Sequence, residues 1–231
     1  MDYRFKKITV ITGEYGCGKT NLTVNIVRDL SSKYTTAAVD LDIVNPYFRT
    51  ADFRRSQILK SADLICPEFA GSNLDIPVLN FDPERIIREH ERTIIDLGGS
   101  DAGAFALGRY RNILRKYTEH MDFIYVFNMY RSLSPSPEEA LISIRSVEEA
   151  ASLRCTALVN NSNLGPETTL KTVTDSFDFA EKLSSVSGLE TIFTCIPYKI
   201  KTSSLNKTGS FYPVTREVRM IWENENYSGE L

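Results

Sequence analysis

Gly13-Glu14-Tyr15-Gly16-Cys17-Gly18-Lys19-Thr20 is the stretch of sequence that decides the fold. It matches the pattern G-x-x-x-x-G-K-[ST] of a phosphate-binding loop, or P-loop. The run Ile8-Thr9-Val10-Ile11-Thr12 before it is apolar and β-branched, which is typical of a buried strand. After it, apolar residues recur at helical spacing at Leu22, Ile26, Val27 and Leu30. The motif is therefore predicted at a strand–loop–helix corner, where a helix N-terminus offers free N–H groups and its positive dipole end to an anion.

Each residue type in the loop suits phosphate binding. The glycines let the backbone turn tightly and approach phosphate oxygens without a Cβ in the way. Lys19 is expected to reach the β- and γ-phosphates and to take part in catalysis, and the Thr20 hydroxyl to bind Mg²⁺. A chance glycine turn before a helix is the alternative, and the flanking strand and helix patterns speak against it. The expected nucleotide contacts in this stretch are Gly13, Glu14, Tyr15, Gly16, Cys17, Gly18, Lys19, Thr20 and Asn21.

Length and composition indicate an ordinary globular protein. The chain has 231 residues, 42% of them hydrophobic and 25% charged, and we expect one P-loop domain over residues 1–231. Its core is expected at about residues 5–200, followed by a C-terminal extension at residues 201–231. The net charge of −3 does not indicate nucleic acid as a partner, and no apolar run approaches the roughly 20 residues that span a bilayer. A strand is expected almost at the N-terminus, so we predict no signal peptide and a cytoplasmic location.

The four cysteines, Cys17, Cys66, Cys155 and Cys195, are widely spaced and have no neighbouring histidine. This spacing argues against a zinc or iron–sulfur site within one chain. The last three lie in or beside apolar runs and are expected to be buried free thiols in a reducing compartment. Cys17 is either a thiol made reactive by Lys19 and the helix N-terminus or a small residue that fits the loop, and we favour the second interpretation.

Strand and helix patterns alternate along most of the chain. Strands are predicted at residues 6–12, 36–41, 63–66, 92–97, 122–129, 154–160 and 190–196, and helices at residues 19–32, 47–59, 83–90, 103–117, 136–152 and 168–186. Most strands are apolar on both faces, which is typical of a parallel sheet covered by helices on both sides. We therefore predict a three-layer α/β fold with a mostly parallel, doubly wound sheet of about seven strands. Residues 198–214 are predicted to be a loop, and residues 214–223 a short helix or an edge strand.

Acidic residues follow two of the predicted strands. Asp40-Leu41-Asp42 ends the second strand, and Asp96-Leu97-Gly98-Gly99 ends the fourth with a D-x-x-G pattern. An ordinary aspartate before a turn would match either pattern, but both stand where a P-loop protein needs carboxylates. Asp96 is expected to hold Mg²⁺, usually through water, and the N–H of Gly99 to reach the γ-phosphate.

With these motifs the chain resembles the MinD/ParA/CobQ group of P-loop ATPases, in a branch that includes the signal-recognition GTPases and dethiobiotin synthetase. The resemblance covers about residues 5–200, and residues 40–49 and 106–110 look like a subgroup of bacterial proteins described only as ATP-binding or ParA-like. It implies that Asp40 lies near Mg²⁺, that Asp96 is the acid on the Mg²⁺ side, and that Asp42 positions the attacking water. It also implies that the base is contacted by Asn160, Asn161 and Pro197.

One position departs from this group. MinD and ParA place a signature lysine directly after the first P-loop glycine, and this chain has Glu14 there. An acid does not neutralise phosphate charge, so a MinD-type dimer that uses that lysine is not supported. We expect that a protein partner or a second copy of the chain completes the site, for instance with an arginine supplied in trans.

The base is predicted to be adenine. In many P-loop GTPases an N-K-x-D element reads guanine through its Asp, and the corresponding segment here, Asn160-Asn161-Ser162-Asn163, has no Asp. The main functional hypothesis is thus a Mg·ATP-binding protein that hydrolyses ATP to ADP slowly and changes shape around residues 42–55 and 96–108. Two alternatives stay open: an ATP-dependent small-molecule kinase, carboxylase or amido-ligase, and a nucleotide-binding assembly factor without hydrolysis.

Overall fold

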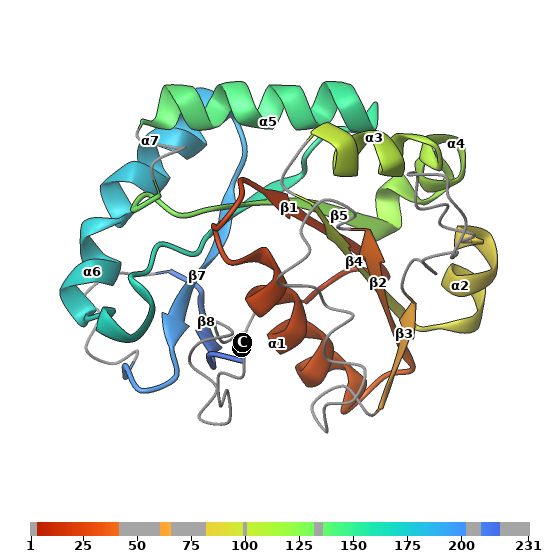
Figure 1. The fold of residues 1–231 in the computed structure, drawn as a ribbon, viewed down its shortest axis with the longest axis horizontal. Helices are drawn as coiled ribbons and strands as arrows, with labels where there is room; N and C mark the ends of the chain where they lie inside the picture. Colours follow the sequence, from red (N-terminus) through yellow and green to blue (C-terminus); the bar gives the residue numbers. More distant parts are fainter. Residues whose placement is uncertain are drawn as a thin grey trace, which may run out of the picture.

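The computed structural model describes residues 4–41, 61–65, 82–98, 101–131, 136–201 and 209–217. Within these residues, eight parallel strands form one sheet in the order β3-β2-β4-β1-β5-β6-β7-β8 (Figure 1). The strands are β1 (Ile8–Gly13), β2 (Thr36–Leu41), β3 (Ala62–Ile65), β4 (Arg92–Leu97), β5 (Met121–Phe127), β6 (Ala157–Asn160), β7 (Thr191–Pro197) and β8 (Phe211–Val214). The predicted α/β class with a parallel sheet is confirmed, and the sheet has one strand more than predicted.

Helices cover both faces of the sheet, as the sequence predicts. Helix α1 lies on one face, against β4 and β2, and the other face carries α3, α5 and α7, which pack side by side (Figure 1). The α-helices are α1 (Lys19–Ser31), α2 (Pro83–Glu89), α3 (Asp101–Gly108), α4 (Arg111–Leu114), α5 (Pro137–Ala151), α6 (Leu170–Asp175) and α7 (Phe177–Ser187). Two 3-10 helices, η3 (Arg115–His120) and η4 (Gly165–Glu167), complete the described elements.

Strand side chains alternate between two hydrophobic cores. On β1, Val10 joins the core beneath α3, α5 and α7, whereas the next residue, Ile11, joins the core beneath α1. On β4, Ile95 and Ile94 divide in the same way. This alternation follows from the two-residue period of a strand, and a sheet buried on both faces needs apolar residues at nearly every position.

Two helices that were predicted to be continuous are interrupted. The predicted helix at residues 103–117 becomes α3, α4 and η3, and it breaks after Gly108, where a Cβ would lie 2.9 Å from the Ala150 carbonyl oxygen of α5. The predicted helix at residues 168–186 divides at Ser176 into α6 and α7. There the Ser176 hydroxyl donates to the Val173 carbonyl and accepts a hydrogen bond from the Asn160 side chain. Close packing and side-chain hydrogen bonds thus override the local helical pattern.

Strand β8 corrects the prediction that residues 198–214 form a loop. Phe211–Val214 pairs in parallel with β7 at the edge of the sheet. Tyr212 is buried and packs against Phe5 and Phe193 at centroid distances of 6.4 and 5.3 Å. Burial of the Tyr212 ring therefore keeps this segment in the sheet although its flanking residues are polar. Pro213 can stand in β8 because an edge strand tolerates a residue without an N–H donor.

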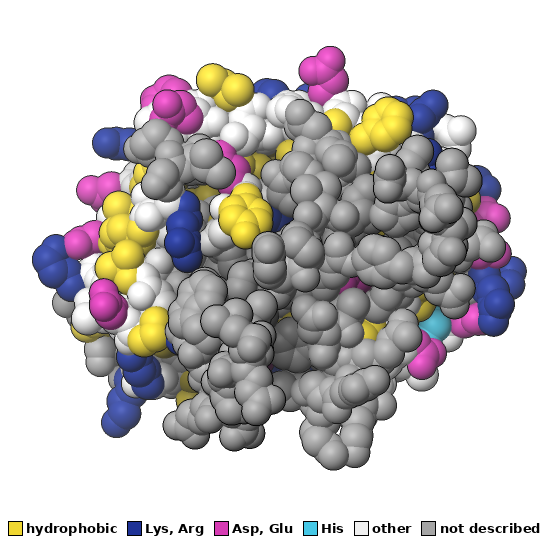
Figure 2. Space-filling model, in the orientation of Figure 1, with side chains coloured by type: hydrophobic (Ala, Val, Ile, Leu, Met, Phe, Trp, Pro, Cys, Tyr) yellow, Lys and Arg dark blue, Asp and Glu magenta, His cyan; other side chains and the backbone are white. Residues whose placement is uncertain are grey.

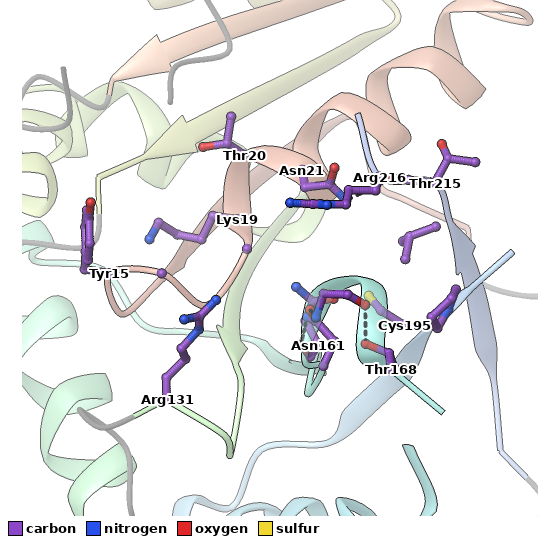
Figure 3. A pocket seen from close by; sticks show the side chains of 16 residues that line it. Tyr15, Lys19, Thr20, Asn21, Arg131, Asn161, Thr168, Cys195, Thr215 and Arg216 are labelled. Atoms are coloured by element: carbon purple, nitrogen blue, oxygen red, sulfur yellow. Dashed lines mark hydrogen bonds between the residues drawn. The ribbon is translucent and has the colours of Figure 1, made fainter. Parts of the chain in front are cut away.

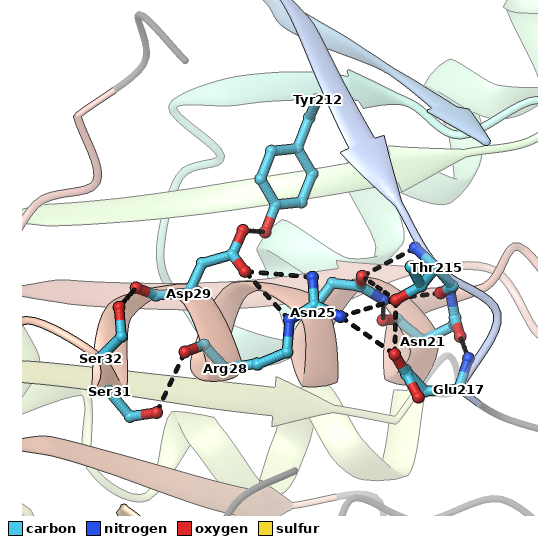
Figure 4. A network of polar contacts seen from close by, with 9 residues as sticks. All are labelled: Asn21, Asn25, Arg28, Asp29, Ser31, Ser32, Tyr212, Thr215 and Glu217. Carbon is cyan, nitrogen blue, oxygen red and sulfur yellow. Dashed lines mark hydrogen bonds and ion pairs between the residues drawn. The ribbon is translucent and has the colours of Figure 1, made fainter. Parts of the chain in front are cut away.

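The chain after β8 is bonded to α1 through side chains of that helix (Figure 4). The Asn25 amide oxygen accepts a hydrogen bond from the Thr215 N–H at 2.9 Å, and its amide nitrogen donates to the Thr215 carbonyl at 2.9 Å. Asn21 bonds in the same way to the Thr215 carbonyl and the Glu217 N–H, at 3.0 and 2.8 Å. Tyr212 donates to Asp29 at 2.8 Å. We call this set of contacts the α1–β8 clasp.

Several predictions fall outside the described residues. These are the helix at residues 47–59, Asp42, Gly99 and Cys66. In the part of the chain that is described, no helix is long and apolar enough to cross a membrane. On the described surface of the face shown in Figure 2, acidic and basic side chains are interspersed and neither sign forms a broad patch.

Candidate functional site

The P-loop connects β1 to α1 in a conformation that requires glycine. Gly13 and Gly18 have φ angles of 144° and 90°, which side chains with a Cβ rarely adopt. A Cβ on Gly13 would lie 2.1 Å from the Val126 carbonyl oxygen, and one on Gly18 would lie 2.4 Å from the Asn161 side-chain nitrogen. The loop thus closes against β5 on one side and against the residues after β6 on the other.

Helix α1 begins at Lys19, directly at the end of the loop. Its N-cap, Gly18, has no side chain to bond the first-turn N–H groups, which suits a helix end that receives an anion. The Lys19 ammonium group curls back and donates to the Glu14 carbonyl at 2.9 Å. Lys19 and Thr20 are 6% and 8% exposed, so both are largely withdrawn from solvent at the base of the loop.

The side chain of Glu14 belongs to the interior of the domain. Its carboxylate accepts a hydrogen bond from the Ser143 hydroxyl of α5 at 2.6 Å, and Glu14 is buried. The neighbouring Tyr125 phenol stays protonated, because burial and then the Glu14 charge raise its pKa. Glu14 is therefore a link between the P-loop and α5.

Asp40 and Asp96 stand side by side at the carboxyl ends of β2 and β4. They are register partners in that strand pair, and each is 1% exposed. Their neighbours Val39 and Ile95 face the α3–α5–α7 core, so the two aspartates face the α1 side of the sheet. Buried oxygen donors on that side, with the Thr20 hydroxyl at the start of α1, fit the preference of Mg²⁺ for few protein ligands, all oxygen. Among the described residues, no three His, Cys, Asp or Glu side chains form a larger metal cluster.

A cavity of about 330 Å³ opens beside the P-loop (Figure 3). It extends from the P-loop to the ends of β7 and β8, which are distant in sequence. Of the residues predicted to bind nucleotide, the cavity is lined by Tyr15, Gly16, Gly18, Lys19, Thr20, Asn21, Asn161 and Pro197. The structure therefore brings the predicted phosphate and base sides together around one space.

The asparagines after β6 divide into different roles. The Asn161 amide nitrogen donates to the Cys17 carbonyl at 2.7 Å and fastens the P-loop to this segment. The amide of Asn163 is engaged at both ends, with the Asn161 carbonyl and the Gly165 N–H. Asn160 is fully buried, bonds to Ser176 at 2.8 Å and is not among the residues lining the cavity. The structure thus places Asn160 behind the cavity wall, where it positions α7.

Sequence reasoning missed half of the cavity wall. The additional described residues are Arg131, Asn163, Gly165, Thr168, Cys195, Val214, Thr215 and Arg216. Arg131 follows β5 at the same sheet edge as the P-loop, so the rule that ligands bind at the carboxyl ends of parallel strands is a signal that points to it. Residues 214–216 have no such signal, because residues 198–214 were predicted to be a loop and residues 214–223 a short helix or an edge strand, with nothing in the sequence to place them beside the P-loop.

The three described cysteines, Cys17, Cys155 and Cys195, are buried free thiols. Burial raises the pKa of Cys17, although the Lys19 charge partly opposes the shift. Burial also raises the pKa of Cys155 and Cys195. These features confirm the prediction that Cys155 and Cys195 are buried free thiols, and they support the interpretation of Cys17 as a residue that fits the loop.

The fold is shared with solved structures of FtsY. The chain superimposes on FtsY from Mycoplasma mycoides with a TM-score of 0.52 and 13% identity, covering 83% of this chain and 59% of that one. FtsY from Thermotoga maritima gives a TM-score of 0.52 and 14% identity, covering 86% and 66%. The chain therefore spans less than two thirds of the length of either, and identities this low establish the fold alone. No family model matches the chain, and no curated protein matches it in sequence. The parallel sheet with helices on both faces, together with the glycine loop between β1 and α1, shows that the protein has the P-loop NTPase fold.

Proposed function

We propose that the protein binds Mg·ATP in the cavity beside the P-loop, hydrolyses it slowly to ADP, and acts as a nucleotide-dependent switch. The observation that carries this proposal is the convergence of three groups at one sheet edge. Lys19 and Thr20 begin α1 behind a glycine loop, Asp40 and Asp96 end adjacent strands, and the cavity continues to the end of β7.

The described residues account for charge and metal binding. The loop N–H groups and the Lys19 ammonium group neutralise phosphate oxygens, and water exclusion strengthens these contacts because the local dielectric is low. The Thr20 hydroxyl and the carboxylates of Asp40 and Asp96 would hold Mg²⁺, which supplies further positive charge to the phosphates when bound. Asp42, two residues after Asp40, is proposed to position the attacking water, and Gly99 to contact the γ-phosphate.

Adenine is favoured by what surrounds the base end of the cavity. Guanine presents two adjacent N–H donors, which P-loop GTPases pair with a carboxylate. The described residues that line the cavity include no Asp or Glu, and the Asn163 side chain is already engaged at both ends. The Asn161 amide nitrogen is bonded to the P-loop, so this side chain offers the guanine donors a single amide oxygen in place of a carboxylate, and this poorer match costs affinity. Asn161 and Pro197 remain the proposed base-side contacts.

The packing after Asp96 offers a way for a change at the nucleotide to reach the helices α3 and α5. A Cβ on Gly103 would lie 2.9 Å from the Gly98 nitrogen, so the backbone of Gly98 is seated directly on α3. Helix α3 packs along α5, to which the P-loop is linked through Glu14 and Ser143. A change at Gly98 on nucleotide binding would therefore be transmitted to the two helices on that face, where a protein partner or a second copy of the chain could detect it.

The test is nucleotide binding by the parent and by Lys19→Ala. We expect Mg·ATP binding by calorimetry in the parent and its loss in Lys19→Ala, with an unchanged circular-dichroism spectrum, because the substitution shortens one side chain and removes its charge without altering the backbone. Parallel titrations with GTP should show weaker binding, and ADP release should show slow turnover of ATP. Binding of Mg·ATP by Lys19→Ala at the parental affinity, or tenfold tighter binding of GTP by the parent, would contradict the proposal.

A further inference from the structure

Arg131 is a cation in the wall of the cavity, and the proposed function assigns it no role. The described cavity residues include three cations, Lys19, Arg131 and Arg216. Lys19 lies at the base of the P-loop, and Arg216 lies beside Asn21 (Figure 3). Arg131 comes from the turn after β5, and in Figure 3 its guanidinium group points to the P-loop from the side opposite α1.

The guanidinium group lies against the crest of the loop. A Cβ on Gly16 would meet the Nε, Cδ and Cζ atoms of Arg131 at 3.8, 3.9 and 4.0 Å. These are ordinary van der Waals distances, so the guanidinium group lies beside Gly16 in the P-loop. Within the described part of the chain, this group makes no hydrogen bond or ion pair, and Arg131 is exposed. An arginine that is placed beside a phosphate loop, and whose donors are not bonded within the described residues, is well suited to bind an anion there.

The backbone that carries Arg131 is held firmly. The Arg131 N–H donates to the Asn128 carbonyl at 3.0 Å, and the Met129 N–H donates to the Ser162 hydroxyl at 3.0 Å. The Asn128 side chain donates to the Asn163 carbonyl at 3.1 Å. The turn is thus fastened to the segment that also holds the P-loop through Asn161. Because its base is fixed, the side chain has to order only its own rotamers when it binds a ligand.

We propose that Arg131 is a second phosphate-binding cation, supplied within the chain, that contacts the terminal phosphates of the bound nucleotide. This proposal rests on the proposed function. It assigns to Arg131 the positive charge that Glu14 does not provide, since the Glu14 carboxylate is turned to Ser143. A guanidinium group offers two parallel N–H donors to phosphate oxygens and stays charged throughout the physiological pH range. The contact favours nucleotides with more than one phosphate.

The experiment compares Arg131→Ala and Arg131→Lys with the parent in binding ATP, ADP and AMP in the presence of Mg²⁺. Arg131→Ala should bind ATP about tenfold more weakly or worse, a loss of about 1.4 kcal/mol, whereas AMP binding stays at the parental level. Arg131→Lys should recover part of the affinity, because it keeps the charge without the planar fork. Arg88→Ala removes an exposed arginine of α2 and is the matched control, expected to bind all three nucleotides as the parent does.

The outcomes separate this inference from the proposed function. If the parent binds ATP and Lys19→Ala does not, but Arg131→Ala binds ATP as tightly as the parent, only the role of Arg131 is overturned. The same conclusion follows if Arg131→Ala loses affinity for AMP and for ATP by the same factor, since the effect then does not come from the terminal phosphates. If the parent binds no nucleoside triphosphate, both proposals are wrong.

Discussion

The side-chain nitrogen of Asn161 occupies the space next to Gly18 that any larger residue would need. The two positions are 143 residues apart, yet a Cβ on Gly18 would come within 2.4 Å of that nitrogen. The same nitrogen donates to the Cys17 carbonyl at 2.7 Å, so the P-loop backbone and the segment after β6 close directly on each other. Glycine is therefore required at position 18 both because φ is 90° and because the Asn161 side chain leaves no room for a Cβ.

Gly18→Ala should damage the site and the fold together. The φ angle alone costs about 1–3 kcal/mol in unfolding free energy, and the Asn161 amide must also move away from the Cys17 carbonyl. We expect lower stability in urea unfolding and weaker ATP binding in calorimetry. Gly188→Ala is the control, because its φ is 72° but nothing lies within 4 Å of the added Cβ. It should lose about 1–2 kcal/mol of stability and no nucleotide affinity. Equal loss of ATP binding in both variants would mean that the Asn161 contact does not matter.

Asp96→Asn should weaken the dependence of nucleotide binding on Mg²⁺. Asp96 ends a buried strand beside Asp40, and a neutral amide there removes one of two charges that would attract the cation. Titrating Mg²⁺ at fixed ATP should show a requirement for about tenfold more Mg²⁺, which corresponds to about 1.4 kcal/mol.

The control for this prediction is Asp122→Asn, another buried aspartate, near the opposite end of the sheet. Asp122 accepts a hydrogen bond from the Lys6 N–H at 3.0 Å, so its substitution should lower stability without changing the Mg²⁺ titration. If Asp96→Asn requires no more Mg²⁺ than the parent does, Asp96 is not a residue of the metal site.

The parts of the fold that could be predicted are those in which local pattern and tertiary packing agree. The P-loop, β1 and α1 follow from one motif and two periodicities, and the structure places them as expected. Strand β8 could not be predicted, because it is held by aromatic packing of Tyr212 against Phe193 and Phe5, which are 19 and 207 positions away in the sequence. Arg131 was missed because a single arginine after a strand carries no pattern, and only the folded chain shows that Gly16 lies beside it.

Asn25→Ala should open the α1–β8 clasp. Asn25 is fully buried, and its side chain bonds to both the N–H and the carbonyl of Thr215. Alanine leaves the Thr215 N–H without its partner and leaves the Thr215 carbonyl with the Asn21 hydrogen bond alone, which should lower the unfolding free energy by about 1–3 kcal/mol. Amide hydrogen exchange at Thr215 should become faster. Ser32→Ala, which removes an exposed hydroxyl at the end of the same helix, should change stability by less than about 0.5 kcal/mol. Unchanged exchange at Thr215 in Asn25→Ala would show that other contacts hold the clasp.

Glu148→Gln should reduce stability at neutral pH but not in acid. Burial raises the pKa of Glu148, but hydrogen bonds from Arg145, Arg154 and the Cys155 N–H outweigh it, and the net pKa lies below its ordinary value of 4.5. A carboxylate with a lowered folded pKa contributes stability above pH 4.5, and this contribution is lost as the pH falls through the folded pKa. Glutamine should therefore lower the unfolding free energy by about 1–3 kcal/mol at pH 7.

The measurement for Glu148 is urea unfolding between pH 3 and pH 8. The difference between parent and Glu148→Gln should be constant above about pH 5 and shrink below pH 4.5. Glu149→Gln changes the adjacent exposed residue and should follow the parent throughout. A gap between parent and Glu148→Gln that stays constant into acid would indicate that the hydrogen-bond geometry, and not the charge, stabilises this corner.

The α1–β8 clasp sets a limit on how the chain can be shortened or extended. Thr215 and Arg216 line the cavity, and the Glu217 N–H is bonded to Asn21, the residue directly after Thr20. A truncated protein that ends at residue 200, where the sequence suggests the core is complete, would lack an edge strand and one wall of the binding cavity. A fluorescent label or fusion joined directly after Glu217 would begin at the mouth of that cavity, so it would act as a sensor of ligand entry or as an obstacle to it.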